Sequence, residues 1–227
     1  MTDQATPSGA TDWALIVDDH PLFCDALELT LRSVSKVSSI QTASRLSGAL
    51  EVIEANEVRP SLIVLDLNLP DVSGLDGVVR LKAVVGACPV IVVSSMDENA
   101  IIGGAIGAGA AGFVPKHSRH SVFKEALNAI ARGEVFKPAG YVETPEAMDM
   151  QSSVDRLASL TRQQSRILEL ICDGKLNKQI AYDLSIAETT VKAHVTAIMR
   201  KLGVQSRTQA VLVAQQTKFA AVLQSSD

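Results

Sequence analysis

The 227-residue chain is predicted to fold into an α/β domain built on a doubly wound, five-stranded parallel sheet, followed by a small all-α domain of four helices. Between residues 13 and 132, short apolar runs alternate with stretches in which apolar residues recur at helical spacing, as in a parallel sheet covered by helices. Beyond residue 160, only helical spacing remains. Residues 1–152 carry 11 Lys and Arg against 19 Asp and Glu, whereas residues 153–227 carry 10 against 6. A basic small domain is compatible with nucleic-acid binding.

The strands of the α/β domain are expected where apolar residues follow one another, because strands of a parallel sheet are buried on both faces. Strands are expected at 13–17, 37–43, 62–65, 90–93 and 112–114, and helices at 21–31, 47–55, 75–85, 98–106 and 118–132. Pro21 suits the first turn of its helix. The fourth helix contains Gly103, Gly104 and Gly107. Each glycine costs about 1 kcal/mol relative to alanine, so we expect this helix to be loose and to move as part of a switch.

Breaks in the pattern divide the chain into five parts. Pro138, Gly140, Pro145 and several Ser predict a linker, with a short helix near residues 153–158. We therefore expect a disordered leader at 1–12, the α/β domain at 13–133, the linker at 134–158, the helical domain at 159–218 and a tail at 219–227.

The composition favours a protein of the cytoplasm. Hydrophobic residues make up 47% of the chain and charged residues 20%, as in globular domains. No apolar run approaches the length of a membrane span, and the first residues lack the features of a signal peptide. The three cysteines are far apart and have no metal-type spacing, which favours a reducing compartment.

Polar side chains follow the predicted strands at the sheet edge where ligands collect in such folds. Asp18 and Asp19 end the first strand, Asp66 the third, Ser94 the fourth and Lys116 the fifth. On its own, Asp66 could equally cap a helix or belong to a turn. Three carboxylates close together repel one another unless a cation is present, and oxygen ligands favour a hard ion such as Mg²⁺. A metal, a hydroxyl and an ammonium around Asp66 would suit a phosphoryl group bonded to its carboxylate.

These residues resemble the receiver domain of bacterial two-component response regulators, which has a flavodoxin-like fold. The resemblance covers about residues 13–132. It rests on Asp18-Asp19-His20-Pro21-Leu22-Phe23, on Asp66-Leu67-Asn68-Leu69-Pro70 with Gly74, and on Ser94 and Lys116. The chain departs from many receivers after the lysine, where His117 replaces a proline and Pro115 precedes Lys116 instead.

The resemblance implies a role for each of these positions. Asp66 would accept a phosphoryl group from a sensor histidine kinase. Asp19 and Asp66 would bind Mg²⁺ together with the backbone carbonyl of Asn68, and Asp18 would assist through water. The resemblance further implies that three residues respond to the phosphoryl group: Ser94 and Lys116 as contacts to its oxygens, and Phe113 as the switch aromatic.

A glycine-rich stretch at residues 107–112 fits the G-x-G-x-x-G pattern of dinucleotide-binding proteins. That motif must follow a strand and open a helix. Here the stretch ends a helix and enters a strand, so its glycines are better interpreted as turn and close-packing residues.

The C-terminal segment predicts a helix-turn-helix. Thr161 and Gln164 form a capping box for the first helix, which stops at Gly174. Asn177 is expected to cap a helix at 178–184, Gly203 to close a helix at 188–202, and Ser206 to cap a helix that runs to about 216. A short helix, a tight turn and a longer helix have the spacing of DNA-binding helix-turn-helix motifs.

The longer helix presents two different faces. Val191, Val195, Ile198 and Leu202 form an inward stripe, whereas Lys192, Ala193 and Thr196 point away from it. In isolation such a polar face is usually an ordinary solvated surface. The helix-turn-helix context and the basic charge of the segment favour a DNA-reading face instead.

This segment closely resembles the LuxR-type DNA-binding domain, which together with the receiver indicates the NarL/FixJ branch of response regulators. The resemblance covers about residues 160–213 and rests on Gly174-Lys175-Leu176-Asn177-Lys178-Gln179-Ile180-Ala181, Thr190-Val191-Lys192-Ala193-His194-Val195, Arg200-Lys201-Leu202-Gly203-Val204 and Ser206-Arg207-Thr208-Gln209-Ala210. It implies that Lys192, Ala193 and Thr196 face base edges, that Lys178, Thr190 and Lys201 contact phosphates, and that the last helix forms a dimer interface.

The sequence thus predicts a transcription regulator, not an enzyme, that binds promoter DNA as a homodimer when phosphorylated. Its expected partners are a sensor histidine kinase, double-stranded DNA and RNA polymerase, with no membrane. Two other functions fit the sequence less well. A phosphohydrolase of the haloacid dehalogenase type would need an Asp at position 68, where this chain has Asn. A regulator that binds DNA without phosphorylation would not need the full set of phosphorylation residues.

Overall fold

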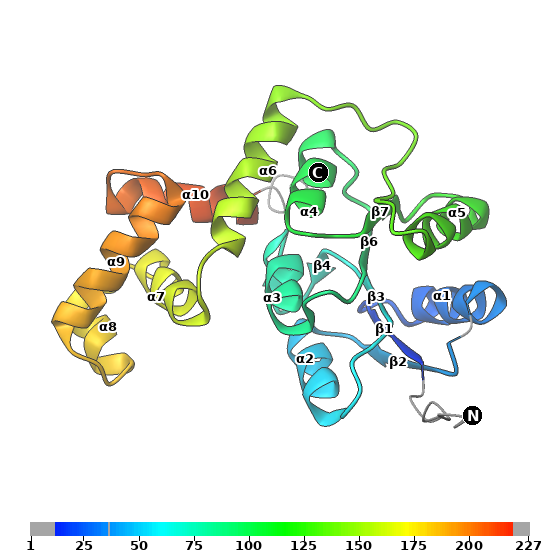
Figure 1. The fold of residues 1–227 in the computed structure, drawn as a ribbon, viewed down its shortest axis with the longest axis horizontal. Coiled ribbons are helices and arrows are strands. Elements are labelled where there is room, and N and C mark those ends of the chain that lie inside the picture. The colour runs from blue at the N-terminus through cyan, green and yellow to red at the C-terminus, as the bar shows by residue number, and fades with distance from the viewer. Residues whose placement is uncertain (1–11, 36, 220–227) are drawn as a thin grey trace, which may run out of the picture.

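The computed structural model describes residues 12–35 and 37–219, so the expected leader and tail lie almost entirely outside the described residues. The α/β domain contains one parallel sheet with the strand order β2-β1-β3-β6-β7 (Figure 1). The strands are β1 (Trp13–Val17), β2 (Ser39–Ala43), β3 (Leu62–Leu65), β6 (Val90–Ser94) and β7 (Gly112–Pro115). The predicted doubly wound, five-stranded sheet is confirmed. The strand order reverses between β1 and β3, which is where such sheets open a crevice.

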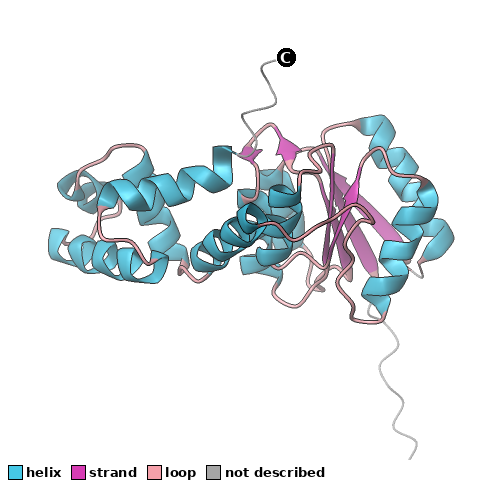
Figure 2. Ribbon diagram, turned by 90° about the horizontal axis from the view of Figure 1, so that it is seen from above, coloured by secondary structure: helices cyan, strands magenta, loops and turns pink. Residues whose placement is uncertain are grey.

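Helices cover both faces of this sheet (Figures 1 and 2). Alternate residues of β1 serve the two faces: Ala14 and Ile16 belong to the core under α1 and α5, whereas Leu15 and Val17 belong to the core under α2, α3 and α4. The helices are α1 (Pro21–Val34), α2 (Leu46–Ala55), α3 (Asp76–Val85), α4 (Asn99–Gly107) and α5 (His120–Ala131), and a small hairpin of β4 (Asn68–Leu69) and β5 (Val72–Ser73) precedes α3.

The C-terminal helices enclose a separate apolar core. They are α7 (Arg162–Cys172), α8 (Asn177–Asp183), α9 (Glu188–Leu202) and α10 (Arg207–Phe219). The predicted capping box is present, because the hydroxyl of Thr161 accepts a hydrogen bond from the Gln164 N–H at 3.3 Å and the Gln164 side chain accepts one from the Thr161 N–H at 3.1 Å. Gly203 closes α9 with a left-handed φ of 68°, as expected.

The expectation that Asn177 caps α8 is wrong. Asn177 is the first helical residue, and Leu176 occupies the cap position. The N–H of Leu176 instead donates to the side chain of Gln179 at 2.7 Å, so the residue three positions into the helix satisfies this end. The Asn177 side chain is occupied elsewhere, because its oxygen accepts a hydrogen bond from Arg207 at 3.3 Å.

The linker contains a longer helix than expected. Instead of a short helix near residues 153–158, α6 (Pro145–Ala158) spans 14 residues. Pro145 occupies its first turn, and the Thr144 hydroxyl accepts a hydrogen bond from the Ala147 N–H at 3.2 Å. Figure 1 shows α6 lying against α4, between the two domains. Its apolar residues are spread thinly among polar ones, so the helical period is weak in the sequence.

The glycines of α4 also have a different surrounding from the one expected. They lie against α6 and allow close packing between the two helices, which the sequence did not indicate. The expectation that α4 is loose and moves as part of a switch stays a prediction. None of the described helices has the length and apolar character that crossing a membrane requires.

Candidate functional site

Three charged side chains meet at the carboxyl edge of the sheet. Asp18 follows β1, Asp66 follows β3 and Lys116 follows β7. The ammonium Nζ of Lys116 lies 2.7 Å from Oδ2 of Asp18 and 2.7 Å from Oδ2 of Asp66. Asp18 is only 4% exposed and Asp66 only 2%. Two buried carboxylates would repel each other, so the shared ammonium compensates both.

An acidic cluster able to hold a metal surrounds Asp66. Ligand atoms of Asp18, Asp19, His20 and Asp66 all lie within 4.8 Å of one another. Nδ1 of His20 lies 2.8 Å from Oδ1 of Asp19 and 3.0 Å from Oδ1 of Asp18. Our sequence reasoning did not include His20 in the site, although its position directly after Asp19 was a signal. Hard divalent ions prefer the carboxylate oxygens over this ring nitrogen.

The other predicted residues of the α/β domain differ in burial, because Asn68 is exposed whereas Ser94 and Phe113 are buried. The backbone N–H of Asn68 donates to Oδ1 of Asp66 at 3.2 Å. Ser94 is fully buried, and its hydroxyl accepts a hydrogen bond from the Met96 N–H at 3.2 Å. The N–H of Lys116 donates to the Ser94 carbonyl at 2.8 Å, which fixes the ends of β6 and β7 next to each other. Phe113 is fully buried in the core of the α/β domain.

Burial and charge act in opposite directions on this site. Burial raises the pKa of Asp66 above its ordinary value, and the hydrogen bond and charge of Lys116 only partly offset that effect. Burial alone would lower the pKa of Lys116, but its bonds to Asp18 and Asp66 outweigh burial and raise the pKa. Lys116 therefore stays charged, and Nζ also lies 4.8 Å from the centre of the Phe23 ring, a cation–π contact that our sequence reasoning missed.

The α9 helix carries the second candidate site. Val191, Ile198 and Leu202 are fully buried and Val195 is partly buried, so the predicted inward stripe is confirmed. The outward residues Lys192, Ala193 and Thr196 are exposed, as are Lys178 on α8 and Thr190 on α9. Lys192 pairs with Glu188 one turn earlier, with 2.9 Å between Nζ and Oε1.

Lys201 differs from the other predicted contacts. Its side chain is not free, because Nζ donates to the Ser159 carbonyl at 2.7 Å and to Oε1 of Gln164 at 2.9 Å. These bonds connect the end of α9 to the end of α6 and to the capping box of α7. The sequence does not reveal them, because the partners lie 42 and 37 residues earlier.

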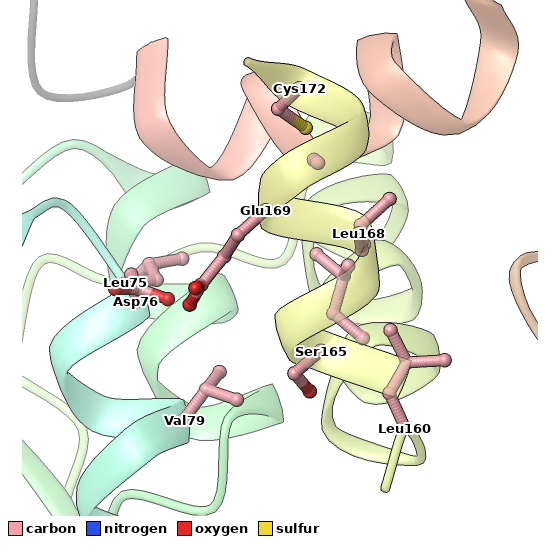
Figure 3. Close-up of a pocket in the computed structure, with 10 residues that line it drawn as sticks. Leu75, Asp76, Val79, Leu160, Ser165, Leu168, Glu169 and Cys172 are labelled. Atoms are coloured by element: carbon pink, nitrogen blue, oxygen red, sulfur yellow. The ribbon is translucent and has the colours of Figure 1, made fainter. Parts of the chain in front are cut away.

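A small pocket lies where α3 meets α7 (Figure 3). Leu75, Val79 and Leu168 are among the residues that line it, and the carboxylate of Glu169 points toward Asp76. No strand-end residue of the Asp66 cluster lines this pocket. It marks the contact between the two domains.

Two families match the chain in the places where the two sites lie. Residues 14–128 match the response regulator receiver domain, and residues 158–214 match the bacterial regulatory proteins of the luxR family. The glycerol metabolism activator of Pseudomonas putida is 38% identical over 216 residues, which covers 92% of this chain and 97% of that protein. The response regulator VraR of Staphylococcus aureus is 31% identical over 203 residues and covers 89% of this chain and 95% of its own length.

Solved structures agree with the fold. RcsB from Salmonella enterica serovar Typhimurium, solved bound to a promoter, superposes with a TM-score of 0.52 over 90% of this chain and 98% of its own, at 19% identity. A LuxR family DNA-binding response regulator from Silicibacter pomeroyi is 34% identical, with a TM-score of 0.50, over 57% of this chain and 99% of its own.

Proposed function

Because the chain belongs to the bacterial response regulators that join a receiver domain to a LuxR-family DNA-binding domain, we propose that phosphorylation of Asp66 controls its binding to promoter DNA. The protein is a DNA-binding transcription regulator of a two-component system, and the members of this family are not enzymes in general. What we propose beyond family membership is that Asp66 is the phosphoacceptor and that its phosphoryl group switches DNA binding.

The observation that carries the proposal is the position of Lys116, with Nζ 2.7 Å from Oδ2 of Asp66. An oxygen of Asp66 would attack the phosphorus of a phosphohistidine on the sensor kinase. A P–O bond forms, the P–N bond breaks, and the imidazole leaves. The ammonium of Lys116 is already in place to neutralise the oxygens of the transferred group. Ser94, at the end of the neighbouring strand, would donate its hydroxyl to the same oxygens.

The donor set around Asp66 fits Mg²⁺. Asp18, Asp19 and Asp66 offer carboxylate oxygens within one small cluster, and hard ions of this kind take oxygen ligands. We assign Asp19, Asp66 and the backbone carbonyl of Asn68 as ligands, with Asp18 acting through water. When bound, the ion would offset the negative charge that gathers on the phosphoryl oxygens.

The switch would use Ser94 and Phe113, which lie on adjacent strands, Ser94 as the last residue of β6 and Phe113 as the second residue of β7. Base edges would be read by Lys192, Ala193 and Thr196, because these side chains are exposed on the outer face of α9. Lys178 and Thr190 would contact phosphates. In the described arrangement Lys201 already bonds Ser159 and Gln164, so it joins the phosphate contacts only after leaving them.

A regulator of this kind needs particular partners and a place in the cell. We propose a sensor histidine kinase as phosphodonor, a homodimer formed through α10 on DNA, contact with RNA polymerase, and a cytoplasmic location. The proposed parts are the leader at 1–12, the receiver at 13–133, the linker at 134–158, the DNA-binding domain at 159–218 and the tail at 219–227.

The test is phosphoryl uptake by Asp66→Asn in the full-length protein. With acetyl phosphate and Mg²⁺, we expect a shifted band on a phosphate-affinity gel for the parent and no shift for Asp66→Asn. Asp97→Asn, which removes a half-exposed carboxylate on the loop after β6, is the matched control and should shift like the parent. A shift that persists in Asp66→Asn would disprove the assignment. DNA binding that is equal with and without acetyl phosphate would favour a phosphorylation-independent regulator.

A further inference from the structure

The α6 helix belongs to the cores of both domains. Val154 is fully buried within the receiver core, among residues of β1, β3, β6, α3 and α4. Leu157 and Leu160 pack against the core of the DNA-binding domain. Figure 1 shows α6 between α4 on one side and α9 and α10 on the other. This helix therefore determines how the two domains lie relative to each other.

Glycines on α4 make the close contact with α6 possible. A Cβ atom at Gly107 would lie 2.5 Å from Cγ of Gln151 and 3.0 Å from its Cα. A Cβ atom at Gly104 would lie 2.7 Å from Cγ of Met150. At Gly103 the nearest atoms are Cβ and the carbonyl oxygen of Ala147, both at 3.0 Å. At Gly107 a larger residue would have to displace α6, because two of the contacts are with backbone atoms of Gln151. At Gly103 it would require Ala147 to give by only a few tenths of an ångström. The glycine face of α4 is therefore a close-fitting seat for this helix.

The start of the linker is attached to the switch elements of the receiver. The Phe136 carbonyl accepts a hydrogen bond from the Phe113 N–H at 3.0 Å, and the Phe136 N–H donates to the Ala111 carbonyl at 3.0 Å. The linker thus pairs with β7 at Gly112, with Phe113 as the neighbouring hydrogen-bond donor. At the other switch element, the Val142 N–H donates to the side chain of Asn99, the first residue of α4, at 3.0 Å.

The far end of α6 is fastened to the DNA-reading helix. Nζ of Lys201 on α9 donates to the carbonyl of Ser159, the residue that ends α6, at 2.7 Å. The guanidinium of Arg156 lies next to Gly203, which ends α9: a Cβ atom added at Gly203 would lie 3.7 Å from Nη1 of Arg156. Among the described residues, Nε of Arg156 is the buried side-chain nitrogen without a hydrogen-bond partner, so this contact carries a cost.

We propose that α6 is a clamp, seated on the glycine face of α4, that fixes the DNA-binding domain against the receiver until β7 and α4 move. The outer face of α9 is already exposed, so the clamp restrains the position of the domain and does not cover its DNA-reading surface. A packed interface has few intermediate arrangements, so a small shift of α4 or of the Phe113 strand unseats the whole helix. The seating is independent of phosphorylation, and only its release rests on the proposed function.

The first test changes the seat without touching either candidate site. Gly107→Ala places a methyl group against the backbone of Gln151. Alanine is also the better helix former, so α4 itself should remain intact. Without a phosphodonor, we expect the amides of α6 in the full-length variant to exchange hydrogen at least about tenfold faster than in the parent, while α5 is unchanged.

Gly48→Ala is the matched control, because Gly48 also lies within a helix and a Cβ there would meet only Ala43, at 4.0 Å. Its α6 amides should exchange at the parental rate. Parental exchange of α6 in Gly107→Ala would overturn the clamp.

The second test joins α6 to α4 covalently by a disulfide. In the double variant Gly103→Cys, Ala147→Cys, the two Cβ positions are close enough for a disulfide after a shift of about 1 Å. After acetyl phosphate and Mg²⁺, the α6 amides should lose protection in the parent and in the reduced variant but keep it in the oxidised variant. The two single cysteine variants control for the native thiols.

The two proposals fail in different ways. Unchanged α6 exchange in a parent whose Asp66 is phosphorylated on the gel would overturn release of the clamp. Absence of the gel shift would instead disprove the proposed phosphorylation, and Gly107→Ala would still decide whether α6 is seated on α4.

Discussion

The two candidate sites differ in how deeply their charged side chains are buried. In the receiver, Asp18, Asp66 and Lys116 are buried and already paired, with 2.7 Å between the ammonium and each carboxylate. On α9, Lys192 is exposed and pairs with Glu188 on its own helix. A buried charge that loses its partner is expensive, whereas an exposed ion pair contributes little to stability. Substitutions in the receiver site should therefore change the free energy of unfolding, whereas substitutions on the outer face of α9 should change only the affinity for DNA.

The largest effect is expected for Lys116→Ala. Removing this ammonium leaves two buried carboxylates facing each other, and breaking such a pair costs about 3 kcal/mol of unfolding free energy. Chemical denaturation without metal at pH 7 measures the loss, and Mg²⁺ should recover part of it by binding the same carboxylates. Lys124→Ala, which removes an exposed lysine from α5, should change stability by less than about 0.5 kcal/mol. Equal stability of the two variants would contradict the buried-pair account.

A smaller effect, on DNA affinity and not on stability, is expected for Lys192→Ala. Binding to an operator selected from random duplex DNA should weaken by about 1–3 kcal/mol, because one base contact is lost. The unfolding free energy should change by less than about 0.5 kcal/mol, because the side chain is exposed. Fluorescence anisotropy measures the first quantity and denaturation the second. A variant that binds normally but unfolds more easily would reverse the comparison.

The receiver site was easier to foresee than the connection between the domains. Asp18, Asp66 and Lys116 each follow an apolar run, and parallel strands bring their ends to one edge, so the pattern predicts the meeting that the structure shows. The α6 helix was underestimated because its contact partner, the glycine face of α4, lies some 40 residues earlier in the chain. Composition suggested that those glycines loosen α4, but only the packed structure shows what lies against them.

Lys201 shows the same limit for a single residue. Its place in the LuxR-type motif indicates a phosphate contact, and nothing local in the sequence indicates bonds to Ser159 and Gln164. Motif position describes what a side chain does in the family, whereas long-range hydrogen bonds depend on how this chain packs its linker against the C-terminal helices.

The smallest effect on stability is expected at Asp71, an exposed charge that nevertheless stabilises the fold. It is exposed, yet Oδ1 accepts a hydrogen bond from the Leu46 N–H at 2.9 Å and Oδ2 accepts one from the Ser47 N–H at 2.8 Å. The residue before α2, Arg45, offers no side-chain cap, so Asp71 caps this helix from 25 residues away. Asp71→Ala should cost about 1 kcal/mol at pH 7, as the loss of a helix cap does.

The pH dependence of that loss identifies its cause. Burial acts to raise the pKa of Asp71, but the hydrogen bonds from Ser47 and Leu46 outweigh it and lower the pKa below the ordinary value of 3.8. The stabilisation is therefore complete above pH 3.8 and disappears as the pH falls through the lower pKa of the folded state. Denaturation curves of the parent and of Asp71→Ala should converge in acid, while Asp25→Ala on the exposed side of α1 should show no such convergence. A difference that stays constant down to the acid end would mean that packing, not the capping charge, accounts for the role of Asp71. That outcome would mean that, of the charges compared here, only the buried ones stabilise the fold.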